Sequence, residues 1–327
     1  MTGGSTAPRT GNSTRPRACD VPEIRAELAA WLAEEGAAHW GRSFVGLGTA
    51  GLPREYSADP YGSAAALAHR AAMGLRAAEM YYVAADLTEL AVAAGRKLPA
   101  YRLHHHELPA ECGLLVWEVP CSVYEVGPLR VPVRAVSWSP HGPGTEVIHW
   151  GLTDERVSEQ ERLSDTPANH LRAQLPALER IASSFLPYGR LPHWLAATEW
   201  EDSRGHQWHA GVERTLMATW LLMGQTLTRE SPAQAPRSAL RRIRRHDPTT
   251  PTSIRYVQLR HATSDPQPPP VPDRRRNYHH RWLVRGHWRN QWLPSRQGHR
   301  PVWVSPHVRG PLGAPLLGGE RVNVLRR

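Results

Sequence analysis

Apolar residues recur at helical spacing in two stretches between residues 20 and 95 of the chain. Asp20 can cap a helix, and an apolar stripe follows it at intervals of three and four residues. A second, alanine-rich pattern extends from about Ser63 to Ala94, and Gly95 is a plausible stop for it. The spacing therefore predicts two helical segments, the second being one long helix.

After Pro99 the spacing becomes that of strands. Short β-rich runs at Leu114–Val119, Val131–Trp138 and Glu146–Trp150 are separated by proline and glycine turns, which predicts a meander of antiparallel strands. Helical patterns return at Pro167–Phe185 and Val212–Leu227. We therefore predict an α+β fold with helices packed on an antiparallel sheet, in a body formed by residues 19–228.

The remaining chain divides by composition. Residues 1–18 are rich in Gly, Ser, Thr, Pro and Arg, which is typical of a disordered tail. The body is followed, in order, by a basic linker (229–251), a strand that joins the body (252–264), a Pro/Arg-rich spacer (265–277) and a small basic β-rich C-terminal module (278–327). The strand prediction depends on the imperfect alternation from Ile254 to Leu259.

Charge is unevenly distributed along the chain. Residues 237–327 hold 19 arginines and four carboxylates, so this end has a formal charge of +15, against −5 for the rest. Such a field attracts phosphate and favours a polyanionic partner. Lys97 is the only lysine in the chain, and this skew toward arginine indicates genomic base composition, which weakens the charge argument.

The basic module interleaves arginines with aromatic rings, which offers forked donors beside stacking surfaces. We predict that Arg281, Arg285, Arg289 and Arg300 contact phosphates and that Trp288 or Trp292 stacks on an unpaired base. Gly286, His287 and Trp303 complete the candidate site, with His287 donating a hydrogen bond or linking the fold. The alternative for each tryptophan is a place in the core of the module.

Signals for catalysis are weak. The sequence has no Gly-rich phosphate loop and no GxSxG elbow, and its three cysteines follow no metal-binding pattern. We therefore expect no cofactor and no catalysis by the chain's own residues. A metal-dependent nuclease remains the alternative, in which His280, His287 and His299 would bind one ion.

The compartment prediction depends on two absences. The N-terminal segment has no apolar stretch typical of a secretory signal, and the longest apolar run, Leu216–Leu227, is about half the length of a membrane span. We expect a cytoplasmic protein with no membrane partner.

The run from Arg285 to Arg289 reads Arg-Gly-His-Trp-Arg and is followed by Trp292 and then by Arg300, Trp303 and Pro306. In order and spacing it resembles the C-terminal signature of the anti-CRISPR family that acts against type V-A effectors. The resemblance implies a phage or plasmid protein that lowers synthesis of the effector nuclease by causing loss of its transcript, which it recognises during translation.

The leading hypothesis is therefore an RNA-associated or translation-associated inhibitor of a host defence component, encoded by a mobile element. Its expected partners are RNA, or a translating ribosome and its nascent chain, with a host nuclease as a further candidate. A third hypothesis is a DNA-binding or protein-interaction factor of a mobile element, in which the acidic body engages a partner and the basic end anchors it.

Overall fold

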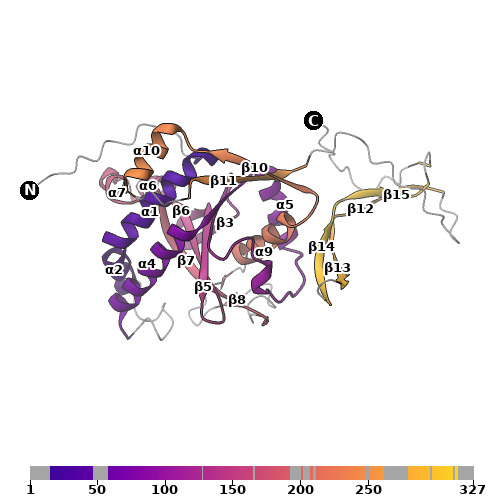
Figure 1. Ribbon diagram of the computed structural model, residues 1–327, viewed down its shortest axis with the longest axis horizontal. Helices are drawn as coiled ribbons and strands as arrows, with labels where there is room; N and C mark the ends of the chain where they lie inside the picture. The colour runs from indigo at the N-terminus through magenta and orange to yellow at the C-terminus, as the bar shows by residue number, and fades with distance from the viewer. Residues whose placement is uncertain are drawn as a thin grey trace, which may run out of the picture.

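The structure is a computed structural model that describes residues 15–46, 58–126, 128–164, 166–191, 200–201, 207–208, 211–246, 251–260, 279–294, 297–311 and 314–315. The fold is α+β, as the sequence predicts, and is built on one seven-stranded sheet with the strand order β10-β11-β1-β2-β5-β6-β7 (Figure 1). These strands are β1 (Glu79–Val83), β2 (Gly113–Trp117), β5 (Ala135–His141), β6 (Gly144–Leu152), β7 (Leu178–Pro187), β10 (Thr228–Gln234) and β11 (Ser253–Leu259).

The sheet is mainly antiparallel, and its parallel part is formed by three neighbouring strands, β11, β1 and β2. From β2 through β5 and β6 to β7 each strand runs antiparallel to its neighbour, which confirms the predicted meander. β1 lies between β11 and β2 and runs parallel to both, which the sequence did not predict. The strand expected near Ile254–Leu259 is β11, and it pairs within this sheet.

Helices cover both faces of the sheet (Figure 1). One face packs on α1 (Val21–Trp31), α2 (Ala37–Gly46) and α4 (Pro60–Ala77), and a π-helical turn at Leu32–Gly36 joins the first two. The other face packs on α5 (Ala85–Gly95) and α9 (Gly211–Met223). Side-chain alternation on β1 explains the two cores, because Met80 and Tyr82 enter the first and Tyr81 and Val83 the second.

Further elements of the body pack outside the seven-stranded sheet. They are the hairpin of β3 (Ser122–Val126) and β4 (Leu129–Val133), the helices α6 (Thr153–Ser164) and α7 (Asn169–Gln174), and the two-residue strands β8 (Trp200–Glu201) and β9 (Gln207–Trp208). Among the described residues, no helix has both the length and the apolar character that crossing a bilayer requires.

Two helix predictions are wrong. The single helix expected over Ser63–Ala94 is α4, then β1, then α5. β1 is buried on both faces, so it has no period-two pattern to distinguish it from the alanine-rich helices on either side. The helix expected over Pro167–Phe185 is the short α7 followed by β7, and Pro176 stands between them, where proline disfavours a continued helix.

The linker predicted at 229–251 is also wrong for most of its length, because it contains β10 and the helix α10 (Arg237–His246). β10 pairs antiparallel with β11 and lies at the edge of the sheet, which is where its Pro232 is tolerated. In α10, Ala239 and Ile243 are one helical turn apart and buried, and the helix packs on α1.

The predicted tail and spacer lie largely outside the described residues, since residues 1–14 and 261–278 are not described. Residues 15–18 are described, and there the disorder prediction is wrong. The carbonyl oxygen of Pro16 accepts a hydrogen bond of 3.0 Å from the Tyr82 hydroxyl, and the Arg17 guanidinium pairs with Asp20 at 3.1 Å. This segment is therefore attached to the first core.

Candidate nucleic-acid interface

The C-terminal segment forms two separate two-stranded sheets. β13 (His287–Leu293) pairs antiparallel with β14 (Gly298–Val304), while β12 (Trp282–Val284) pairs with β15 (His307–Arg309). In the β13–β14 hairpin Trp288 lies opposite Trp303, and Trp292 lies opposite His299 near the turn. Alternation on paired strands thus puts these four rings on one face of the hairpin.

One end of the hairpin is part of the protein core. Trp303 is only 7% exposed and belongs to the buried cluster that contains the apolar side chains of α9. Its partner Trp288 meets it edge to face with ring centroids 5.3 Å apart, and the Trp288 indole N–H donates a 2.9 Å hydrogen bond to the carbonyl of Ala94 in α5. The structure therefore gives these two predicted site residues structural roles.

Arg300 lies against the body as well. Its Nε is 3.8 Å from a carboxylate oxygen of Glu107, and this carboxylate also accepts hydrogen bonds from the Tyr101 hydroxyl and the backbone N–H of His104. The Glu107 side chain is 5% exposed, so the two opposite charges compensate each other away from water. Arg300 joins the hairpin to the body in this arrangement.

The other end of the hairpin is open. Trp292 is 50% exposed, and its ring meets the His299 ring edge to face at 5.1 Å between centroids. An indole held by a neighbouring ring yet half exposed is a suitable surface for stacking on an unpaired base. Among the predicted tryptophans, Trp292 has the geometry that stacking requires.

The arginines of this segment lie away from Trp292, because Arg285 precedes β13 at the docked end of the hairpin and Arg289 lies three residues from Trp292 on the opposite face. Arg285 and Arg289 are exposed, and an Nη of Arg289 donates a 2.8 Å hydrogen bond to Gln291 beside it. Arg281 is partly buried and its Nε donates to the carbonyl of Ala314 at 2.8 Å. The sequence has no acidic residue from position 274 to position 319, so the charge of this segment is not compensated from within it.

Gly286 and His287 shape the start of β13. A Cβ on Gly286 would lie 2.5 Å from Cζ2 of Trp303, so this glycine is required by close approach, and its φ is not positive. Nδ1 of His287 is 3.0 Å from the carbonyl oxygen of Arg285 and is the donor of that contact. His287 therefore braces the turn that precedes the hairpin.

The hairpin register is incompatible with the alternative metal site. His287 and His299 lie at opposite ends of the hairpin, five ladder positions apart, which is about 17 Å at the usual rise of a strand. His280 precedes β12, which belongs to the other small sheet. In the described part of the chain no three His, Cys, Asp or Glu side chains are grouped to hold a metal ion. The three histidines cannot share one ion in this structure.

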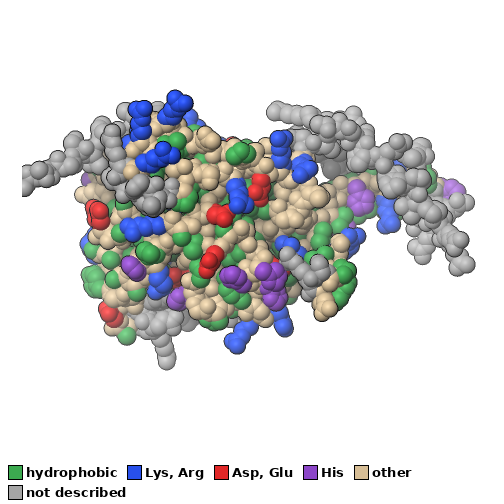
Figure 2. Space-filling view, in the orientation of Figure 1, with side chains coloured by type: hydrophobic (Ala, Val, Ile, Leu, Met, Phe, Trp, Pro, Cys, Tyr) green, Lys and Arg blue, Asp and Glu red, His purple; other side chains and the backbone are tan. Residues whose placement is uncertain are grey.

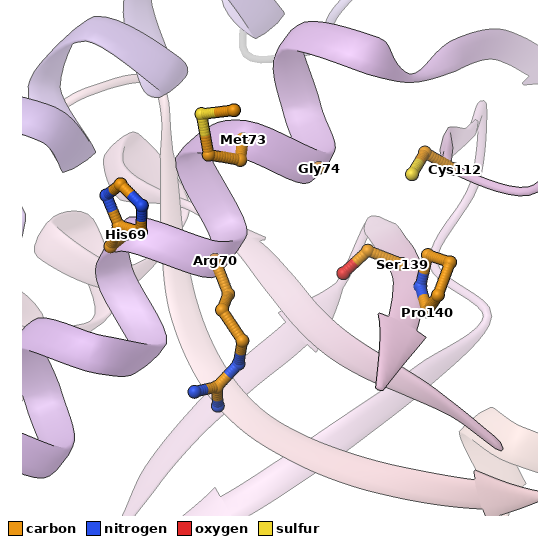
Figure 3. A pocket seen from close by; sticks show the side chains of 7 residues that line it. All are labelled: His69, Arg70, Met73, Gly74, Cys112, Ser139 and Pro140. Carbon is orange, nitrogen blue, oxygen red and sulfur yellow. The ribbon is translucent and has the colours of Figure 1, made fainter. Parts of the chain in front are cut away.

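Two features of the body were missed by the sequence patterns. The first is a shallow pocket of about 330 Å³ beside α4 (Figure 3). In Figure 3 the Arg70 guanidinium points away from Cys112 and Ser139, and it pairs with Glu146 at 3.2 Å. Burial raises the pKa of the Cys112 thiol, so this pocket has no activated nucleophile.

The second feature is a buried polar cluster around His149 on β6. The Tyr124 hydroxyl is 2.9 Å from Nδ1 of His149, while Ser184 Oγ and a carboxylate oxygen of Glu213 are 3.4 Å and 3.5 Å from Nε2. Burial lowers the pKa of His149 despite the nearby Glu213 carboxylate. These residues are more than 20 positions apart in the chain, so no sequence motif could have indicated the cluster.

Comparisons with known proteins add little. No protein-family model matches the chain, and no curated protein matches it. Among solved structures the chain is similar to one titled "Crystal structure of AcrVA2", with a TM-score of 0.36 and 11% sequence identity over 88% of this chain and 93% of the other. A TM-score this low does not establish a shared fold.

Proposed function

We propose that this protein is encoded by a mobile element and is an anti-CRISPR-like inhibitor of a host defence component, and that it acts by binding RNA along the β13–β14 hairpin. One observation supports the proposal above all: the docked hairpin presents a half-exposed Trp292 in a segment that is rich in arginine and has no acidic residue from position 274 to position 319. Docking of the Trp303 end fixes the hairpin on the body, so the strand that carries Trp292 is in position before binding.

In this proposal Arg285 and Arg289 neutralise phosphates, and Trp292 stacks on an unpaired base. The resemblance of residues 285–306 to the type V-A anti-CRISPR signature gives the transcript of a host effector nuclease as the target. The rest of that signature then attaches the hairpin to the body and shapes its start. In this proposal it positions the residues that touch RNA, and its members are Gly286, Trp288, Arg300 and Trp303.

The test is binding of the full chain to a labelled single-stranded RNA across a salt series. Each phosphate contact changes the slope of log affinity against log salt by about 0.7, so Arg285→Ala with Arg289→Ala should reduce the slope by about 1.4. The matched control removes Arg130 and Arg162, which are already paired with Glu125 at 3.2 Å and Glu159 at 2.7 Å. The control removes the same charge but should leave the slope unchanged.

Trp292→Ala is expected to weaken RNA binding by about 5- to 150-fold, since stacking contributes about 1–3 kcal/mol per base. Its thermal stability should change little, because the ring is half exposed. Binding that is independent of salt, or equal loss in the control, would remove RNA from the proposal. Metal-dependent RNA cleavage that His287→Ala abolishes in the folded protein would make the chain a nuclease instead.

The cellular target is tested separately. Production of the protein with a type V-A effector should lower the effector transcript, and Trp292→Ala should restore that transcript. An unchanged transcript beside intact RNA binding in vitro would refute the anti-CRISPR target while leaving the interface in place.

A further inference from the structure

The arginines of α10 lie on a face of the molecule that the hairpin does not occupy. Arg237, Arg241 and Arg244 are exposed and follow one another at intervals of four and three residues, which puts them on one stripe of the helix. The buried Ala239 and Ile243 occupy the opposite face. Figure 2 shows basic side chains gathered over this helix, and in Figure 1 α10 and the β13–β14 hairpin lie at opposite ends of the body.

Charge compensation differs between the members of the helix. Arg242 points toward α1 and forms a two-pronged pair with Glu23, at 2.6 and 2.9 Å. Within the described residues no hydrogen bond or ion pair joins the side chain of Arg237, Arg241 or Arg244 to another group. Among the four α10 arginines whose side chains the structure describes, Arg242 therefore serves the fold, and the other three have no partner in the described part of the chain.

Helix stability does not account for these three residues. Arg237 occupies the first turn, where the positive end of the helix dipole favours an acidic side chain. Arg241 has a like charge one helical turn away on each side, an arrangement that destabilises a helix. Guanidinium forks that are costly to the helix and unpaired within it match the geometry of phosphate oxygens.

We propose that the Arg237–Arg241–Arg244 stripe of α10, named here the α10 stripe, binds the phosphodiester backbone of a nucleic acid. The stripe is about 10 Å long at 1.5 Å per residue, and no aromatic or amide side chain lies within it to read bases. Contacts to phosphate oxygens carry no sequence information, so we expect binding that is independent of sequence. A membrane surface fits less well, because the apolar face that would enter a lipid layer is already buried against α1.

The α10 stripe is separate from the hairpin, so this inference does not depend on the proposed function. A nucleic acid held at both ends of the body would meet two independent sets of arginines. Independent sites predict that the effects of their variants on the binding free energy add.

The experiment uses the full chain with three labelled probes: a single-stranded RNA, an RNA duplex and a DNA duplex. Arg237→Ala with Arg241→Ala and Arg244→Ala should weaken binding at least tenfold at low salt and reduce the single-strand salt slope by about 2. Lysine at the same three positions should keep most of the slope, since it keeps the charge. The control of equal charge removes the exposed Arg42 of α2 together with Arg130 and Arg162, and its nucleic-acid affinity should fall by less than about twofold.

Weaker binding by the triple variant should not come from unfolding. Alanine is the best helix former and removing like charges relieves repulsion, so this variant should melt no lower than the parent. The triple variant should weaken nucleic-acid binding by the same factor in a chain that already has Arg285→Ala and Arg289→Ala. Equal losses in the triple variant and its control would overturn the inference. So would binding to phosphatidylserine vesicles that requires the stripe while nucleic-acid binding does not. Either result would leave the hairpin proposal standing.

Discussion

At position 149 a histidine is completely buried between the sheet and α9, with no exposed ring atom. A neutral ring satisfies its neighbours if Nδ1 accepts from the Tyr124 hydroxyl and the Nε2 proton faces Ser184 and Glu213. Burial raises the pKa of Tyr124 well above its usual value, so that hydroxyl keeps its proton for this contact. Protonation of His149 would place a charge away from water, and this burial outweighs the opposing effect of the Glu213 carboxylate, while Arg180 adds a smaller effect in the same direction as burial.

The pKa of His149 is therefore lower in the folded protein than in the unfolded chain, and the direction of its pH effect follows. As pH falls below about 6.5, the unfolded chain takes up a proton that the folded protein refuses, so acid favours unfolding. We expect the free energy of unfolding to fall more steeply between pH 7.5 and 5.5 in the parent than in His149→Gln. Chemical denaturation at several pH values measures this, and parallel curves would contradict it.

Single residues also show why the site could be predicted only in part. Trp288, Trp292 and Trp303 are indistinguishable as amino acids: the sequence placed all three in the candidate site, with Trp288 or Trp292 as the stacking residue, and left a core role open for each. The hairpin register and the position of α9 decide between the two, because they bury Trp303 and leave Trp292 half exposed. Exposure of a side chain depends on tertiary contacts that no local pattern contains.

At the scale of elements, the approach of Gly286 to Trp303 defines how the hairpin begins. Gly286→Ala should destabilise the protein by about 1–3 kcal/mol, because the new Cβ would overlap the indole ring at 2.5 Å. In a chain that already has Trp303→Phe, the same change should cost less, since the smaller ring leaves space. Thermal or denaturant unfolding of the four proteins in this cycle gives the coupling. Additive costs would show that the glycine is needed for another reason.

The elements that the sequence predicted well have a recognisable pattern within their own residues. The β2–β5–β6 meander has proline and glycine turns, and α9 has a long apolar run. β1 and α10 were missed because β1 has no alternation and α10 is dominated by arginine. In both cases the apolar contacts that stabilise the element come from distant parts of the chain, β11 and β2 for β1 and α1 for α10.

At the scale of the whole molecule, the basic end is attached to the acidic body by apolar packing and by one buried charge pair. Trp303 fills the second core, Trp288 donates to α5, and Arg300 meets Glu107. The sequence divided the chain at residues 265–277, where the composition changes, and a change in composition does not reveal whether the following segment packs on what precedes it. The β13–β14 hairpin is a part of the body core in the structure.

A chain that ends at residue 277 should therefore be less stable than the full protein. Its α5 and α9 would lose the cover of Trp288 and Trp303, and the loss of one buried tryptophan alone typically costs about 3–5 kcal/mol. The shortened chain should melt at lower temperature and bind a hydrophobic dye at the uncovered surface. A chain ending at residue 315, which keeps both small sheets, should melt like the full protein. Equal melting of the chain ending at 277, together with independent folding of residues 265–327, would instead show that the basic end is a separate module.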